Sequence, residues 1–246
     1  MILIGDIHGN YKYIKHLVRH RHLKGEILIQ VGDFGVGFAD DKGIDIELLV
    51  ELDTFLKERD CVLYVIRGNH DDPTFFEGDY MYDNLKLLPD YTVLELEDRK
   101  VLFVGGAISI DRSDRRMWNA ESIGYGSERR SYWEGEKFNL DTEKLSACRD
   151  VDVVVTHTCP SYIWPTELNH LVLHFVKLDD QLYGDLMEER GKLDQMYEYL
   201  RIHDNNPIPR WYYGHFHNSQ ITEFRGTEFR LLGINESYEL REGINI

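Results

Sequence analysis

Side chains that can bind metal ions follow apolar runs of this sequence at five separate places. They are carboxylates, one amide and imidazoles: Asp6, His8, Asp33, Asn69, His70, Asp71, His157, His215 and His217. Oxygen and nitrogen ligands without thiolate suit Mn²⁺, Fe or Zn²⁺ in a catalytic site better than they suit a structural zinc site, which is rich in cysteine. The residue types therefore predict a catalytic metal centre.

Two metal ions are favoured over one, because a carboxylate such as Asp33 can bridge a pair of ions. Such a pair lowers the pKa of a shared water molecule to give hydroxide near neutral pH. It also clamps the attacking and leaving oxygens of an in-line displacement at phosphorus. The expected reaction is hydrolysis of a phosphate ester.

Taken singly, these residues also have structural interpretations. Asp6 could cap a helix, and His157 could be a hydrogen-bonded histidine of the core. His215 and His217 lie two positions apart on what we expect to be an extended chain, so they would project from the same face. Such a pair is as often structural as ligating, and only the combination of all the groups favours a metal centre.

Alternating apolar and amphipathic stretches predict the elements that position these side chains. Strands are expected at residues 2–4, 27–31 and 62–66, with helices at residues 11–22 and 44–57 between them. Their near-continuous Val, Ile and Leu content favours parallel strands in a sheet that is covered on both faces. The carboxyl ends of parallel strands share one edge of a sheet, so ligands far apart in the sequence can meet there. The predicted fold class is α/β.

After Pro89 the pattern changes and predicts a second sheet. Residues 91–97 and 100–106 are expected to form an antiparallel pair, and residues 111–139 a long loop with one short helix. The later elements are a strand at 151–156, a helix at 179–203 and short strands at 211–214, 219–224 and 228–232. No stretch has the composition of a linker, so we expect one domain over residues 1–246.

The acidic composition restricts the partners. Acidic residues outnumber basic residues by 44 to 28, and the formal net charge of −16 argues against long nucleic acid as a substrate. The three cysteines are too scattered for a disulfide framework, which favours a reducing compartment. No apolar run approaches the ~18 to 20 residues that span a bilayer. We therefore expect a cytoplasmic protein that does not enter membranes.

Five short motifs carry a resemblance to one family. They are DxHG at residues 6–9, GDxx at 32–35, GNHD at 68–71, a lone histidine after a strand at 157, and GHxH at 214–217. All five stand in the family's order and span nearly the whole chain. The protein resembles the calcineurin-like metallophosphoesterases, and residues 107–111 resemble a segment of the bacterial and phage members.

The resemblance implies a complete site, with two divalent metal ions. One ion would be held by Asp6, His8, Asp33 and His217, and the other by Asp33, Asn69, His157 and His215. Mn²⁺ is the first expectation for the metal, with Fe, Zn, Ni or Mg as alternatives. A metal-bridging hydroxide would attack phosphorus, His70 would be the general acid, and Asp71 would fix its orientation and tautomer. The implied fold is a four-layer α/β/β/α sandwich of two packed mixed β-sheets flanked by helices.

One departure from the family concerns the cation that grips phosphate. Many relatives follow GD with an acid and an arginine, whereas this sequence has Phe34 and Gly35. Activity as a Ser/Thr-type protein phosphatase is therefore in doubt. Among the arginines of residues 112–130 we select Arg112, together with Asn69, as substrate-binding residues, because a guanidinium fork suits phosphate oxygens.

Three kinds of function compete on this sequence. The first is a hydrolase of phosphomonoesters or phosphodiesters, with a small phosphate ester or a nucleotide as substrate. The second is a binding or scaffold module that keeps the fold but lacks catalysis, although such a module has no use for His70. The third, a mononuclear zinc hydrolase acting on carbon esters or amides, would not need Asn69.

Overall fold

Two β-sheets form the centre of the molecule in a computed structural model, which describes residues 1–38, 42–80, 82–203 and 208–240. The first sheet has the order β11-β1-β2-β3-β4. Its strands are β1 (Ile2–Ile4), β2 (Ile27–Gln30), β3 (Val62–Val65), β4 (Leu85–Leu87) and β11 (Ser237–Glu239). Strands β1 to β4 are parallel, and β11 pairs with β1 in the antiparallel sense.

The second sheet has the order β5-β6-β7-β8-β10-β9. Its strands are β5 (Thr92–Leu96), β6 (Arg99–Val104), β7 (Val153–Thr156), β8 (Arg210–Tyr213), β9 (Gln220–Phe224) and β10 (Thr227–Leu231). The four central strands β6, β7, β8 and β10 are parallel, and the two edge strands are antiparallel to their neighbours. The predicted antiparallel pair after Pro89 is confirmed as β5 and β6.

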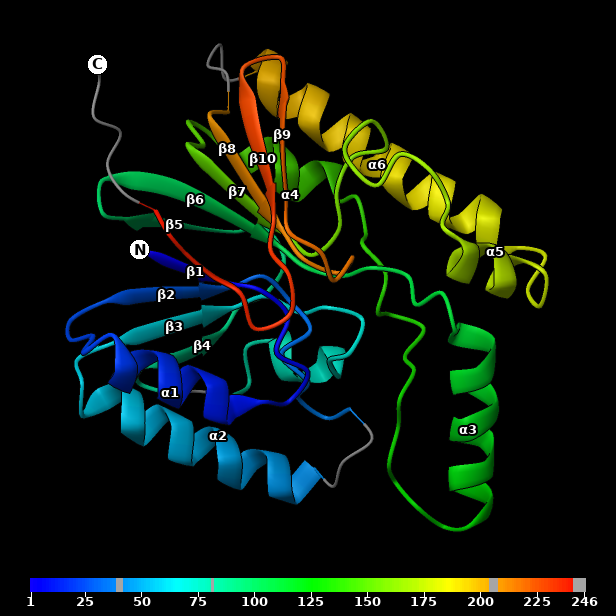
Figure 1. The fold of residues 1–246 in the computed structure, drawn as a ribbon, viewed down its shortest axis with the longest axis horizontal. Coiled ribbons are helices and arrows are strands. Elements are labelled where there is room, and N and C mark those ends of the chain that lie inside the picture. Colours follow the sequence, from blue (N-terminus) through cyan, green and yellow to red (C-terminus); the bar gives the residue numbers. More distant parts are fainter. Residues whose placement is uncertain (39–41, 81, 204–207, 241–246) are drawn as a thin grey trace.

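Helices cover the outer face of each sheet (Figure 1). The helices are α1 (Tyr11–His20), α2 (Lys42–Lys57), the short 3₁₀ helix η1 (Pro73–Phe76), α3 (Arg112–Gly124), α4 (Thr142–Ala147), α5 (His170–Val176) and α6 (Leu182–His203). Helices α1 and α2 pack on the first sheet, and α4 and α6 pack on the second. A third apolar cluster joins the two sheets, with Leu3 and Val31 on one side and Phe103 and Val155 on the other. The predicted four-layer α/β/β/α order is confirmed.

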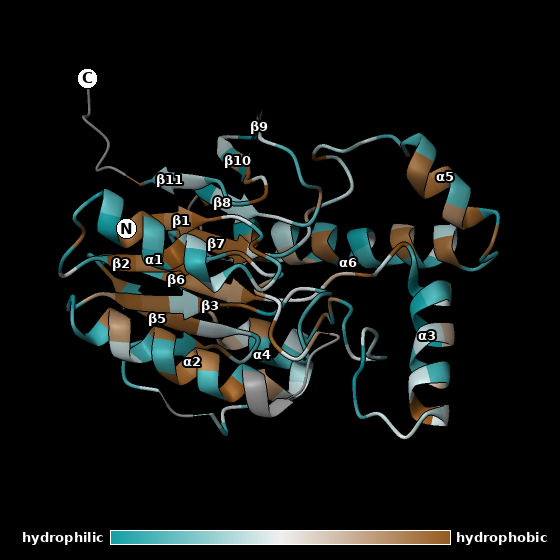
Figure 2. Cartoon of the chain, turned by 60° about the horizontal axis from the view of Figure 1, so that its bottom comes forward, coloured by the Kyte–Doolittle hydropathy of each residue, from teal (hydrophilic) through white to brown (hydrophobic). Residues whose placement is uncertain are grey.

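Strand β1, residues 101–104 of β6 and residues 153–155 of β7 are apolar because both of their faces are buried. In β6, Val101 and Phe103 point into the layer between the sheets, while Leu102 and Val104 point toward the outer helices. Alternate side chains of a strand lie on opposite faces, so a strand in a middle layer must be hydrophobic throughout. Figure 2 shows this as a hydrophobic centre, with hydrophilic residues on the outward sides of the helices.

The segment at residues 111–139 differs from the expected loop with one short helix. Helix α3 runs over 13 residues, from Arg112 to Gly124, and extends away from the two sheets (Figure 1). Its buried residues are Arg112 and Arg115, so it has no apolar stripe. A helix without an apolar face gives no hydrophobic period in the sequence, which is why the pattern did not predict it.

Five further elements were not expected from the sequence: β4, β11, η1, α4 and α5. The two strands have three residues each, too few for a pattern, and none of the residues of α5 is buried. No described helix is both long enough and apolar enough to cross a membrane.

Candidate metal centre

The ends of strands from both sheets converge on one place. Strand β1 leads to Asp6 and His8, and β2 leads to Asp33. Strands β7 and β8 of the second sheet lead to His157 and to the pair at 215 and 217. The sequence predicted that the ligands would meet where parallel strands end, and the strands that lead to them belong to both sheets. Long-range packing of the two sheets is therefore needed to form the site.

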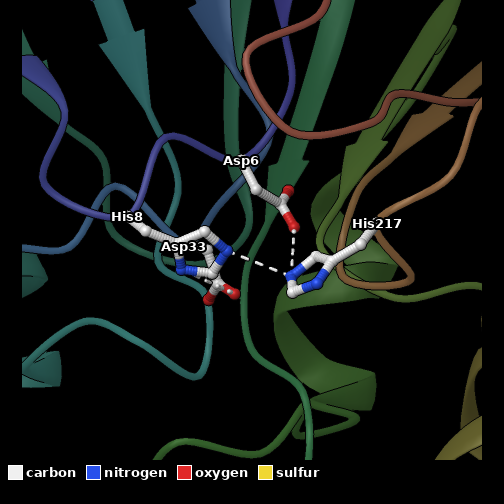
Figure 3. A group of neighbouring side chains, drawn as sticks. All are labelled: Asp6, His8, Asp33 and His217. Carbon is white, nitrogen blue, oxygen red and sulfur yellow. Dashed lines mark hydrogen bonds and ion pairs between the residues drawn. The ribbon is translucent and has the colours of Figure 1, made fainter.

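A first cluster consists of Asp6, His8, Asp33 and His217, whose ligand atoms all lie within 4.8 Å of one another. Figure 3 shows the four side chains pointing toward a common centre. The Nε2 atoms of His8 and His217 are 3.0 Å apart, and Nε2 of His217 lies 3.5 Å from Oδ2 of Asp6. These four are the predicted ligands of one metal ion.

A second cluster consists of Asp33, His157 and His215, also within 4.8 Å of one another. Oδ1 of Asn69 belongs with them, 2.8 Å from Nδ1 of His215 and 3.2 Å from Nε2 of His157. His157 is completely buried, and its Nδ1 donates to the carbonyl oxygen of Val31 over 2.8 Å. That bond fixes the ring so that Nε2 faces the cluster.

Asp33 belongs to both clusters, and the partners of its two carboxylate oxygens indicate whether metal ions fit there. Oδ1 accepts from the backbone N–H of His70 at 2.8 Å and lies 3.1 Å from Nε2 of His157. Oδ2 is buried and accepts no hydrogen bond from any residue that the structure describes. A buried carboxylate oxygen without a donor is costly unless a cation or a water molecule satisfies it. A pair of cations bridged by Asp33 fits this arrangement.

Burial and mutual charge shift the protonation of the two clusters in the metal-free protein. Burial raises the pKa of Asp6 well above its usual value, and the charge of Asp33 adds to this. Burial also opposes ionisation of Asp33, but His157 and His70 outweigh it and hold the Asp33 pKa well below its usual range. For His157, burial is outweighed by the charge of Asp33, which raises the pKa to about 9. A proton thus sits where we expect a cation.

Four residues of the two clusters have left-handed backbone conformations: His8, Asp33, His215 and His217, with φ of 46°, 55°, 70° and 51°. The prediction that His215 and His217 lie on an extended chain is therefore wrong. They follow β8 in a tight loop, and each reaches a different cluster. Non-glycine residues in this region cost free energy and gather at functional sites.

The glycines before the ligands allow close packing at the same place. A Cβ on Gly68 would collide with Oδ1 of Asp33, and one on Gly214 would collide with Oδ1 of Asp6. The missing Cβ at these two positions therefore lets the backbone approach the two carboxylates closely.

His70 lies beside both clusters without belonging to either. Its ring stacks on Phe38 with centroids 4.4 Å apart and meets the ring of His8 edge to face at 4.6 Å. Nη2 of Arg115 lies 2.6 Å from Nε2 of His70. A guanidinium can only donate, so Nε2 of His70 is the acceptor and the ring is neutral in this state. Burial acts in the same direction and lowers the pKa of His70 to about 4.

The family model for calcineurin-like phosphoesterases matches residues 1–219 of the sequence. The chain belongs to the calcineurin-like phosphoesterase family. Every residue of the two clusters falls inside the matched range. No match was found among the curated proteins.

Solved structures of related shape include proteins with diverse roles. GAP50, the anchor in the inner membrane complex of Plasmodium, is 14% identical, with 96% of this chain and 72% of that chain covered and a TM-score of 0.42. A putative 5'-nucleotidase from Staphylococcus aureus is 15% identical, with coverage of 95% and 48% and a TM-score of 0.45. Phosphopantetheinyl hydrolase from Mycobacterium tuberculosis is 14% identical, with coverage of 95% and 89% and a TM-score of 0.39.

Asp71 has a different task in this calcineurin-like phosphoesterase from the one predicted. We expected it to orient the ring of His70, but none of its described hydrogen bonds reaches that ring. Its carboxylate instead accepts from four backbone N–H groups, those of Phe34, Gly35, Val36 and Gly68. Asp71 therefore ties the loop after β2 to the loop after β3, and so holds Asp33 and His70 in register.

Arg112, selected for substrate binding, has no described hydrogen bond or ion pair with a residue of either cluster. Its guanidinium is paired with Asp179 at 2.7 Å and with Asp185 at 2.6 Å. These partners raise its pKa and hold the start of α3 against the residues before and within α6. Arg115, one helical turn further on, is the arginine that reaches the site. The sequence placed both on the candidate arginine segment, but choosing between them requires the direction of α3.

Proposed function

We propose that this protein hydrolyses small phosphate esters, either monoesters or diesters, with two divalent metal ions. The observation that carries the proposal is the buried carboxylate of Asp33. It is shared by two ligand clusters, and its Oδ2 has no hydrogen-bond donor among the described residues. We expect Mn²⁺ first, with Fe, Zn, Ni or Mg as alternatives.

Metal ions held by the two clusters would lower the pKa of a bound water molecule. Their positive charge would also lie next to the phosphate oxygens. The chain's own residues would bind and orient the ester. The strong acidity of the whole chain favours a small anion that docks locally over a long polyanion.

Arg115 is our candidate for the cation that grips the phosphate group, in place of the arginine that many relatives carry after GD. Its side chain is 10% exposed and is held by a 2.7 Å ion pair with Asp111. It contacts the backbone oxygen of Asn69 at 3.3 Å and the ring of His70 at 2.6 Å. A phosphate group next to His70 would therefore meet a guanidinium that is already oriented.

His70 is our candidate for the general acid. In the ligand-free state it accepts a hydrogen bond from Arg115, so it has no proton to give from Nε2. When a phosphate group occupies Arg115 instead, Nε2 is released and the negative charge nearby favours the protonated ring. The pair would thus couple substrate binding to readiness for proton transfer.

The decisive experiment uses metal-free protein and two chromogenic substrates, a phosphomonoester and the matching phosphodiester, with Mn²⁺, Zn²⁺, Mg²⁺, Ni²⁺ or Fe²⁺ added back. We expect hydrolysis with at least one metal. His70→Ala should keep its bound metal and lose roughly 10²- to 10⁴-fold in turnover of the preferred substrate. If the wild type bound two ions yet hydrolysed neither ester, the scaffold interpretation would replace ours.

Arg115→Ala should lower kcat/KM by about 10²- to 10³-fold, because a preformed donor to the phosphate oxygens is lost. Arg116→Ala is the matched control, since Arg116 is a neighbour on the same helix whose partly exposed side chain pairs with Glu134. It should leave the kinetics unchanged. Equal kinetics in the Arg115 variant and the wild type would exclude Arg115 as the phosphate-binding cation.

A further inference from the structure

Ser109 lies in the segment between β6 and α3 and is 1% exposed. Its hydroxyl is within hydrogen-bond distance of three other side chains: Glu136, Asn69 and Arg115. A hydroxyl has one hydrogen to donate and two lone pairs that accept. The roles of all three contacts can therefore be assigned from the chemistry of the partners.

Glu136 takes the hydroxyl hydrogen. One oxygen of its carboxyl group accepts from Oγ of Ser109 at 2.9 Å, and the other accepts from the backbone N–H of Ser109 at 2.8 Å. The carboxyl group itself is well fixed, since Glu136 is 2% exposed and Arg67 donates to its backbone oxygen over 2.8 Å. Arg67 is in turn held by a 2.7 Å ion pair with Asp90.

With its hydrogen engaged, Oγ of Ser109 can only accept from its other two neighbours. Nδ2 of Asn69 donates over 3.0 Å, and Nη1 of Arg115 donates over 2.9 Å. An asparagine amide that presents its nitrogen to Ser109 must turn its oxygen the other way. Oδ1 of Asn69 consequently faces His157 and His215 in the second cluster.

We infer that Ser109 is a positioning residue that sets the amide orientation of Asn69 and, with the same oxygen, helps to hold Arg115 beside His70. The inference rests on the proposed function, because Asn69 needs a fixed oxygen only if the second cluster binds a metal ion. One buried hydroxyl thereby links a metal ligand to the proposed phosphate-binding cation.

The two linked residues depend on Ser109 to different degrees. Arg115 keeps its contacts with Asp111, the Asn69 backbone and His70 when the hydroxyl is removed. The amide nitrogen of Asn69 has no other hydrogen-bond acceptor among the described residues. Loss of the hydroxyl should therefore act first on metal binding and only second on substrate binding.

The test is calorimetric titration of metal-free Ser109→Ala with Mn²⁺, in the absence of any phosphate. We expect the ion that binds the second cluster to bind about 10- to 100-fold more weakly than in the wild type, as is usual when a partner of a metal ligand is removed. The ion of the first cluster should bind as before. Asp6→Asn, in wild-type and Ser109→Ala backgrounds, weakens the first cluster and thereby identifies which binding step belongs to the second.

Ser113→Ala is the matched control, because the hydroxyl of Ser113 contacts Asp179 at 3.2 Å and lies outside the clusters. It should bind both ions as the wild type does. Glu136→Gln should shift the second binding step in the same direction as Ser109→Ala but less, since an amide can replace only one of the two carboxylate acceptors. This second variant also covers the case in which Ser109→Ala fails to fold.

The outcomes separate the two proposals. A wild type that binds fewer than two ions overturns the proposed function together with the inference. If Ser109→Ala and Glu136→Gln each bind two ions with the same affinities as the wild type, only the role of Ser109 is overturned. Selective weakening of the second step in Ser109→Ala, or in Glu136→Gln where Ser109→Ala does not fold, supports it.

Discussion

The two ligand clusters share Asp33 but differ in their access to solvent. In the first cluster the side chains of His8 and His217 are 25% and 45% exposed. In the second, His157 is completely buried and is held by a carbonyl oxygen, and Asn69 is held by Ser109. The first cluster is therefore more open to solvent than the second, in which His215 is partly buried and His157 and Asn69 are held by hydrogen bonds. Metal bound at the second should be retained longer than metal bound at the first.

The largest effect is expected from a substitution of Asp33, the residue that the two clusters share. Asp33→Asn replaces the shared carboxylate with a neutral amide that cannot bridge two cations, so both ions should be lost and hydrolysis should fall to background. Metal content after desalting, measured by atomic spectrometry, checks this. Asp6→Asn is the control and should spare the second cluster. Two full equivalents retained by the Asp33 variant would contradict the bridging role.

The next largest effect concerns how much each cluster contributes to the free energy of unfolding. His157→Ala leaves Asp33 and the Val31 carbonyl buried without their partner, so it should lower the free energy of unfolding of the metal-free protein by about 1–3 kcal/mol. His217→Ala removes an exposed ring and should change that free energy by less than about 0.5 kcal/mol. Urea denaturation measures both variants under the same conditions. Equal destabilisation would mean that the clusters do not differ in burial as the structure indicates.

The strands and most of the ligand-bearing residues could be predicted from the sequence because two independent patterns agree there. Continuous apolar runs marked β1, β2, β3 and β7, and polar ligand types stood directly after them. The pattern could not predict how the two sheets pack against each other. The conformations of His215 and His217 depend on that packing, since a strand continued past Gly214 would have pointed both rings to one side.

The arginine side of the site was harder to predict for a different reason. Helix α3 buries Arg112 and Arg115 and no apolar residue, so no hydrophobic period marks its position or direction. Which arginine reaches His70 depends on the direction of α3, at whose start Arg112 is paired with Asp179. The role of Asp71 was missed similarly, because its four partners are backbone groups, which leave no trace in residue types.

The smallest expected effect concerns protonation, which differs between the histidines of the two clusters. In the metal-free protein both ring nitrogens of His157 face oxygen acceptors: the Val31 carbonyl at 2.8 Å and Asp33 at 3.1 Å. The charge of Asp33 outweighs burial and raises the pKa of His157 to about 9, so the ring is protonated at pH 7. By contrast, burial lowers the pKa of His8 and His217, so these rings are neutral.

Metal binding at the second cluster must therefore displace the proton on Nε2 of His157, while the imidazoles of the first cluster release none. Below about pH 9, the affinity of the second cluster should rise about tenfold per pH unit, and this dependence should flatten above that pH. Calorimetry in buffers of different ionisation enthalpy counts the released protons. Asp6→Asn removes the other carboxylate or imidazole of the two clusters whose pKa is raised, so about one proton should still be released in that variant. If close to zero protons were released, His157 would already be neutral in the metal-free protein, and metal binding at the second cluster would displace no proton.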